Sequence, residues 1–195
     1  MSGHNPVKES FEKIQGAIRG MQTLQVVYLG LELGLFETLK SAPVTPEALA
    51  DAKGLYLPYL RIWMQTAVAF GILEYADGAY QLAPGMDTVL LDGDHPRYVG
   101  GFAKGFFTFL AEDFARYPQA FHDGQVRGFG DHGEAFSAWV SKLTHPMQRL
   151  VAGKILPEQI GAGLQTGIDI LDVGCGAGQF LFKLAAQYPN CRFTG

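Results

Sequence analysis

The sequence predicts a mainly α-helical N-terminal part, then a helical linker, then the opening β-α-β portion of an α/β domain. Three observations support this prediction. Apolar residues recur at helical spacing over most of the chain, one hairpin pattern interrupts them, and a glycine turn follows an aliphatic run near the end. The 195 residues are 48% hydrophobic and 17% charged, which suffices for one substantial core or two small ones.

The first helical stretch runs from about Glu9 to Leu39. Its apolar residues follow helical spacing: Phe11, Ile14, Ile18, Met21, Leu24, Val27, Leu31, Leu35 and Leu39. Gly20 and Gly34 are weak points in the pattern, so we expect two helices or one bent helix. Pro43 ends the stretch.

A shorter helix is expected to begin at Thr45-Pro46-Glu47-Ala48, which supplies a hydroxyl cap, a proline at the first helical position and an acidic first turn. This helix ends near Gly54. A further helix follows from Leu57 to Phe70, with apolar residues on nearly every side. Core or subunit-interface burial explains this all-round apolar character best.

A β-hairpin is expected next, with strands at Ile72 to Tyr75 and Ala79 to Leu82 around an Asp77-Gly78 turn. Helix, short helix, helix and hairpin is the order of a winged helix. DNA binding does not follow, because Leu24 to Asp92 carry eight acidic residues against three basic ones, a net charge of −5. Nonspecific DNA affinity comes from basic contacts to phosphate, so no nucleic-acid partner is expected.

The middle section, from Pro96 to Gly163, has a helical pattern and many aromatic residues. We expect its helices to be interrupted at four places: Pro118, the glycine-rich stretch Gly124 to Gly133, Pro146 and Pro157. Helical spacing puts Phe102, Phe106 and Phe109 on one face. A second face is predicted to hold Phe107, Leu110, Phe114 and Tyr117. Each ring taken singly suits core packing, whereas their number also suits an apolar substrate chamber. We therefore predict Phe102, Phe106 and Phe109 as substrate-contacting residues.

The last section begins with Gly167 to Val173, an aliphatic run typical of a central strand in a parallel sheet. A glycine turn, a helix from Ala177 to Tyr188 and a second strand at Arg192-Phe193-Thr194 follow. Glycines leave no side chain between backbone and ligand, so the turn predicts a nucleotide-like ligand held against the peptide. The expected domains are thus residues 1–95, 96–163 and 164–195.

The residue types around the turn indicate which ligand it holds. A dinucleotide fingerprint starting at Gly174 would need glycine or alanine where Gln179 stands. Asp172 would repel a pyrophosphate but attract an ammonium group. S-adenosylmethionine carries an ammonium and a sulfonium, and its carboxylate can lie at a helix N-terminus. The candidate cofactor-binding residues are Asp172, Gly174, Gly176 and Gly178.

The motif Asp172-Val173-Gly174-Cys175-Gly176-Ala177-Gly178 resembles the first motif of class I S-adenosylmethionine-dependent methyltransferases. Leu33 to Leu39 and Gly71 to Leu82 resemble the winged-helix dimerisation domain of two-domain small-molecule methyltransferases, often O-methyltransferases. The resemblance implies a Rossmann-like catalytic domain and methyl transfer from S-adenosylmethionine to a small, hydrophobic or aromatic acceptor. It also implies a homodimer formed through the N-terminal helices and the winged helix.

The chain departs from this family pattern in one respect. Related enzymes place a ribose-binding acid at the end of the second strand, and any catalytic histidine later still. Neither position is reached by Gly195, so we expect a chain truncated early in the catalytic domain, without a catalytic residue and inactive by itself. Four histidines before the loop are expected to be surface or packing residues: His95, His122, His132 and His145.

The cysteine content and the net charge bear on metal binding, localisation and membrane attachment. The two cysteines, Cys175 and Cys191, offer neither a disulfide framework nor a metal-ligand spacing, so no metal is expected. We expect a cytoplasmic protein without a leader, a membrane span or attraction to anionic lipid, since the net charge is −4. Two alternatives stay open: a non-enzymatic dimerisation module, and a winged-helix regulator that senses a hydrophobic ligand.

Overall fold

The computed structural model describes residues 5–176 and 178–195. Helix α1 (Pro6–Glu32) begins where the Asn5 side chain accepts hydrogen bonds from the backbone N–H groups of Val7 and Lys8, each 3.1 Å long. It passes through Gly20 without a break. The predicted break occurs at Gly34, whose φ of 61° lies in the left-handed region, and helix α2 (Leu35–Ser41) follows.

The next two helices and the hairpin match the sequence pattern. Helix α3 (Pro46–Lys53) is capped by Thr45 and ends at Gly54, and helix α4 (Leu57–Ala69) follows. Strands β1 (Leu73–Ala76) and β2 (Ala79–Leu82) pair antiparallel in the predicted hairpin. The bend at Asp77 and Gly78 has φ values of 50° and 83°, which suit a tight two-residue hairpin turn.

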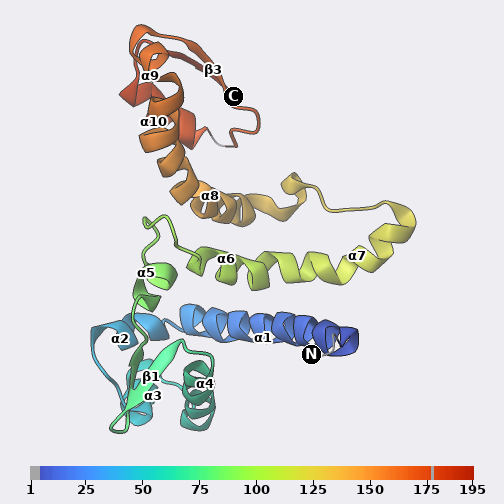
Figure 1. Ribbon diagram of the computed structural model, residues 1–195, viewed down its shortest axis with the longest axis vertical. Coiled ribbons are helices and arrows are strands. Elements are labelled where there is room, and N and C mark those ends of the chain that lie inside the picture. The colour runs from blue at the N-terminus through green and yellow to red at the C-terminus, as the bar shows by residue number, and fades with distance from the viewer. Residues whose placement is uncertain (1–4, 177) are drawn as a thin grey trace.

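One hydrophobic core joins α1 to these elements, and Figure 1 shows the C-terminal end of α1 beside α2 and α4. The Phe36 and Trp63 ring centroids are 5.7 Å apart, and Trp63 Nε1 donates to the Val26 carbonyl oxygen at 3.0 Å. A Cβ atom at Gly30 would overlap the Phe36 ring, so only glycine fits this helix crossing. Helix α5 (Met86–Leu91) closes the core through Leu90.

The middle section is one long helical run followed by a second. Helix α6 (Gly100–Gly105), a π-helical turn (Phe106–Leu110) and α7 (Ala111–Asp123) are continuous. A short 3₁₀ turn (Phe129–His132), α8 (Gly133–Leu150), a second π-helical turn (Val151–Ile155) and α9 (Leu156–Thr166) come next. Pro118 and Pro146, which we expected to interrupt the section, lie inside α7 and α8.

The C-terminal section contains the predicted strand, helix and strand. Strands β3 (Asp169–Leu171) and β4 (Arg192–Thr194) pair in parallel, with α10 (Gln179–Gln187) between them in sequence. A small core on one face of the sheet comprises Leu164, Leu184 and Tyr188, with Ile170 and Phe193 packed on it. On the other face Leu171 is 68% exposed, so α10 covers only one side of the sheet.

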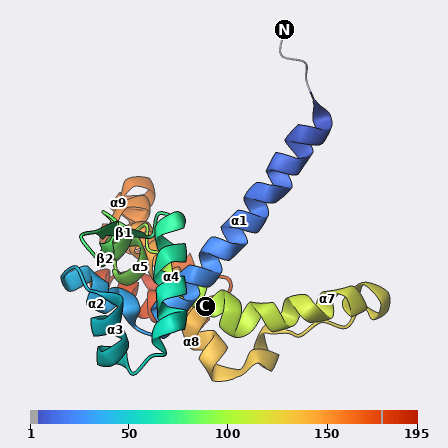
Figure 2. The same cartoon turned by 90° about the horizontal axis from the view of Figure 1, so that it is seen from below.

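Two helices extend away from the cores. Figure 2 shows the N-terminal half of α1 and the length of α7 pointing out in different directions. Among the described residues, every helix is too short or too polar to cross a bilayer.

Candidate functional site

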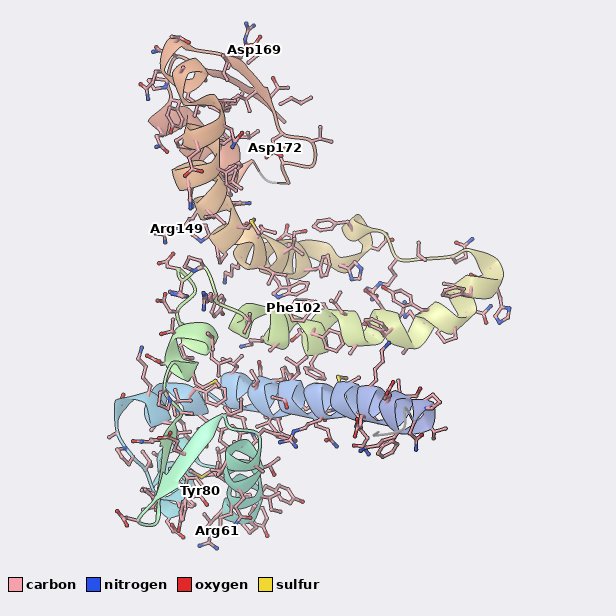
Figure 3. The ribbon with its side chains drawn as sticks, in the orientation of Figure 1. Arg61, Tyr80, Phe102, Arg149, Asp169 and Asp172 are labelled. Atoms are coloured by element: carbon pink, nitrogen blue, oxygen red, sulfur yellow. The ribbon has the colours of Figure 1, made fainter. Side chains whose placement is uncertain are left out.

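The turn after β3 begins with Asp172, labelled in Figure 3. Its backbone N–H donates to the Thr194 carbonyl oxygen at 2.9 Å, so β4 holds the main chain of Asp172 in place. Its half-buried carboxylate has no hydrogen bond or ion pair with any residue that the structure describes. The carboxylate is therefore free to accept hydrogen bonds from a ligand.

Three glycines shape the turn. Gly174, Gly176 and Gly178 have φ values of 86°, 57° and 71°, which other residues adopt only with strain. The space beside the Cα atoms of Gly174 and Gly176 is open, since an added Cβ would meet nothing within 4 Å. Conformation, not crowding, requires glycine here. The remaining residue of the motif, Ala177, lies outside the described residues.

The turn delivers its backbone into α10. Gly178 N–H donates to the Cys175 carbonyl oxygen at 3.0 Å, which closes the turn. Gly178 caps α10 without a side-chain hydrogen bond, and the first turn of the helix has no acidic residue. The unpaired N–H groups at this end favour an anionic group. Together with the Asp172 carboxylate, the turn can hold a zwitterion with separated positive and negative ends.

The three phenylalanines predicted to contact substrate do not share one face. The ring centroids of Phe102 and Phe106 are 6.2 Å apart, and Phe106 continues to Phe114 at 5.9 Å. Phe109 instead packs on α8, with its ring centroid 5.4 Å from Trp139. The π-helical turn explains the difference, because its wider turn rotates later residues away from α-helical spacing.

Phe109 lies next to the place where α6 packs tightly on α8. Trp139 Nε1 donates to the Gly101 carbonyl oxygen at 2.7 Å, and a Cβ atom at Gly105 would overlap the Trp139 ring. Phe136 completes the cluster, with its ring centroid 5.5 Å from that of Phe109. Phe109 is therefore packed between helices, whereas Phe102, 41% exposed, presents its ring at the surface.

An Asp–His pair was missed by the sequence analysis. Asp113 on α7 is buried, and its Oδ2 atom lies 3.3 Å from Nε2 of His132, which was expected to be an ordinary surface or packing residue. The His132 ring stacks on Phe136 with centroids 4.2 Å apart. One signal was present in the sequence: Asp113 follows Phe109 by one helical turn and so shares its buried side.

The remaining residues singled out in the sequence are three histidines and two cysteines. His95 accepts a hydrogen bond from the Arg97 N–H, His145 lies 2.7 Å from Lys183 Nζ, and His122 is exposed. Cys175 and Cys191 are free thiols. Within the described ranges, no group of three or more metal-ligating side chains could hold a metal ion.

Comparison with known proteins identifies the fold. No protein-family model and no curated protein sequence matches the chain. The mitomycin 7-O-methyltransferase MmcR is similar in structure, with a TM-score of 0.74, 18% identity, and coverage of 95% of this chain and 57% of that one. The S-adenosylmethionine-dependent methyltransferase SibL has a TM-score of 0.64 at 20% identity, with 94% and 57% covered.

Human N-acetylserotonin methyltransferase, solved in complex with SAM (S-adenosylmethionine), has a TM-score of 0.64 at 16% identity, with 99% of this chain and 59% of that chain covered. The chain thus spans less than three fifths of the length of each of these structures. At such low identities the likeness establishes the fold alone. Over the part that it spans, the chain has the fold of these methyltransferase structures.

Proposed function

We propose that the chain is part of an S-adenosylmethionine-dependent methyltransferase that acts on a small, hydrophobic or aromatic acceptor. One observation carries the proposal. The Asp172 carboxylate, which has no partner among the described residues, precedes three glycines with positive φ angles, and the helix that follows them has no side-chain cap at its N-terminus. The likeness of the fold to methyltransferase structures supports the same reading.

The residues of the turn fit this cofactor. Asp172 would accept hydrogen bonds from its ammonium group, and the first N–H groups of α10 would face its carboxylate. Gly174 and Gly176 would let it approach the bare backbone. When bound, S-adenosylmethionine supplies a methyl group already activated on a sulfonium, so the protein mainly has to align the acceptor and exclude water.

The acceptor is proposed to lie against the aromatic section of residues 96–163. Phe102 and Phe106 are the best placed of the three predicted residues, because their rings adjoin and Phe102 is partly exposed. Phe109 would act by holding α8 in position. We propose no catalytic residue among the 195 residues. Of the four histidines that the structure describes before the turn, His95 and His145 have local contacts, His122 lies exposed, and His132 pairs with Asp113.

Residues 1–95 are proposed to form a winged-helix domain that joins two copies of the chain. The order α2, α3, α4 and hairpin supports the winged helix. The free half of α1 supports the homodimer, because it exposes an apolar row: Val7, Phe11, Ile14, Ile18 and Met21. A groove of about 450 Å³ between α1 and α4, flanked by exposed Tyr59 and Ile62, extends this apolar surface. The acidic excess argues against DNA in place of a second copy.

The dimer is tested by sedimentation at tens of micromolar. Phe11→Glu should shift the chain towards monomer, because it places a charge in an apolar interface. Gly16→Glu, which adds the same charge at an exposed position of α1 on the side away from the apolar row, serves as the matched control. A monomeric wild-type chain, or equal effects of the two substitutions, would contradict the dimer.

The 195-residue chain by itself is proposed to bind cofactor weakly and to have no turnover. One face of the β3–β4 sheet is open, with Val173 87% exposed, so the turn has no covering wall on that side. A two-stranded sheet by itself is only marginally stable in water. Residues 164–195 are accordingly proposed as the beginning of a Rossmann-like domain. Two free cysteines suit a reducing, cytoplasmic setting.

Calorimetry with S-adenosylmethionine and S-adenosylhomocysteine tests the site. Asp172→Asn should weaken binding about tenfold to a hundredfold, since a charge-assisted hydrogen bond contributes about 1.5–3 kcal/mol. Asp169→Asn, at the start of β3, is the matched control, because its carboxylate pairs with Arg192 at the surface. Unchanged binding by Asp172→Asn would refute the assignment. Salt-sensitive binding of duplex DNA instead would favour the regulator.

A further inference from the structure

The free half of α1 has a regular apolar row along one side. Residues 6–20 are all exposed, and Figure 2 shows this half of the helix projecting from the rest of the chain. The members of the row are spaced alternately by four and three residues: Val7, Phe11, Ile14, Ile18 and Met21. This alternation is the a/d spacing of helices that pack lengthwise on one another. The α1 row therefore has the pattern of a helix that packs on a second helix.

The α1 row continues into the groove between α1 and α4. Because an α-helix turns by about 100° per residue, Gln25 and Leu29 lie in line with the row, and both line the groove. Tyr59 and Ile62 on α4 form the opposite wall. Row and groove thus make one strip from Val7 to Leu29, which is about 33 Å long at a rise of about 1.5 Å per residue.

Charged side chains lie beside or behind this strip. The helical spacing places the charged residues of the free half outside the row: Lys8, Glu9, Glu12, Lys13 and Arg19. Lys8 pairs with Glu12 on α1 itself, and Arg19 is turned towards α4, where it donates to the Ala69 carbonyl oxygen at 3.2 Å. An uncharged strip of this kind suits another apolar helix and offers no contact to a phosphate-bearing partner.

The exposed apolar area of the strip matches what a stable dimer needs. The residues of the α1 row, together with Leu29, Tyr59 and Ile62, are 40–77% exposed. At roughly 150–200 Å² for each whole side chain, they present about 700–900 Å² per copy. A stable protein–protein interface buries about 800 Å² per partner. One partner that covers both row and groove is therefore sufficient.

A second copy of the chain supplies a helix that covers both parts of the strip at once. In a two-fold dimer each surface meets the same surface of the other copy. If two α1 helices pair antiparallel about Ile18, Val7 of one copy faces Leu29 of the other, and Phe11 faces Gln25, because each pair is spaced equally about residue 18. A parallel pair would instead bring row onto row and leave both grooves empty.

We propose that two copies of the chain pair through antiparallel α1 helices centred on Ile18, so that the free half of each α1 fills the α1–α4 groove of the other copy. This inference rests on the homodimer proposed above and adds its geometry. Each groove is then completed by Val7 and Phe11 of the other copy, packed between α1 and the α4 wall of Tyr59 and Ile62. The pairing covers the apolar row that a single copy leaves in water.

Disulfide cross-linking tests the pairing in a chain that has serine in place of Cys175 and Cys191. Under mild oxidation the Val7→Cys/Leu29→Cys double variant should form covalent dimers, because the two positions meet between copies but lie about 33 Å apart within one helix. Val7→Cys alone and Leu29→Cys alone should cross-link at least tenfold less, since identical positions lie about 33 Å apart in an antiparallel pair.

Two further variants provide a positive and a negative control. Ile18→Cys should cross-link by itself, because residue 18 lies on the two-fold axis. Gly16→Cys, on the side of α1 away from the row and with open space around it, should not cross-link. These positions are all exposed, so the substitutions leave the hydrophobic core unchanged.

Sedimentation of the reduced variants separates the two ways in which the pairing can fail. The antiparallel pairing is overturned, and the homodimer stands, if a dimeric chain cross-links through Val7→Cys alone as well as through the double variant. A dimer in which neither the double variant nor Ile18→Cys cross-links has the same meaning. A monomer at tens of micromolar overturns both the pairing and the homodimer.

Discussion

The N-terminal core and the C-terminal core differ in how completely the surrounding elements enclose them. Around the N-terminal core, helices and hairpin enclose Leu35, Phe36 and Met64 completely. Around the C-terminal core, α9 and α10 cover one face of a two-stranded sheet and leave Leu171 on the other face exposed. The first region has the enclosed core that a stable domain needs, whereas the second leaves one face of its sheet uncovered.

This difference places the glycine turn in the less stable region. The turn follows the open edge of β3, and its own residues Val173, Gly174 and Gly176 are exposed. Ligand-binding loops are commonly drawn from the low-stability part of a fold. A ligand at the turn would therefore stabilise the region with the smaller core.

The largest expected effect comes from the N-terminal core. Phe36→Ala should lower the free energy of unfolding by about 3–5 kcal/mol, because it opens a cavity at a fully buried position. Leu171→Ala, on the open face of the sheet, should change it by no more than about 0.5 kcal/mol. Urea denaturation followed by circular dichroism measures both. Similar losses of unfolding free energy in the two variants would contradict the difference between the two regions.

An intermediate effect is expected in the glycine turn. Gly176→Ala should destabilise the C-terminal region by about 1–2 kcal/mol, because alanine is strained at a φ of 57°. Gly16→Ala, in open space on α1, should be neutral or stabilising by up to about 1 kcal/mol. Hydrogen exchange of the α10 and α4 amides locates the loss. Equal loss in α4 would mean that the two regions unfold as one.

The smallest effect concerns pH. Burial raises the pKa of the Tyr98 phenol above its usual value. The folded state therefore favours the protonated phenol, so its contribution is complete below a pH of about 10 and is lost as the pH rises through the folded-state pKa. Tyr98→Phe should lose less stability than wild type on going to alkaline pH. Parallel curves for the two proteins would contradict this.

Features governed by local chemistry could be predicted from the sequence. Thr45 and Gly54 bound α3, Gly34 separates α1 from α2, and Asp77-Gly78 forms the hairpin turn. Each depends on a cap or on a left-handed φ angle that few residue types adopt. The glycine turn after β3 was predictable for the same reason.

Features that depend on distant contacts could not be predicted. The π-helical turn at Phe106–Leu110 moved Phe109 away from Phe102, because periodicity assumes regular α-helical spacing. Pro118 lies inside α7, where helix breaking was expected. The burial of Asp113 depends on Arg127 and His132, which reach it only after the chain has turned back from α7.

The central claim is that the glycine turn after β3 binds S-adenosylmethionine. Nitrogen-15 NMR of the 195-residue chain, titrated with S-adenosylhomocysteine to about 1 mM and above, tests it directly at the affinity expected for an uncovered site. We predict that the amide signals of residues 172–179 shift first and saturate together, and that the Asp172→Asn variant needs at least tenfold more ligand. Unperturbed turn signals, or shifts that begin in α1, α4 or α7, would contradict the account.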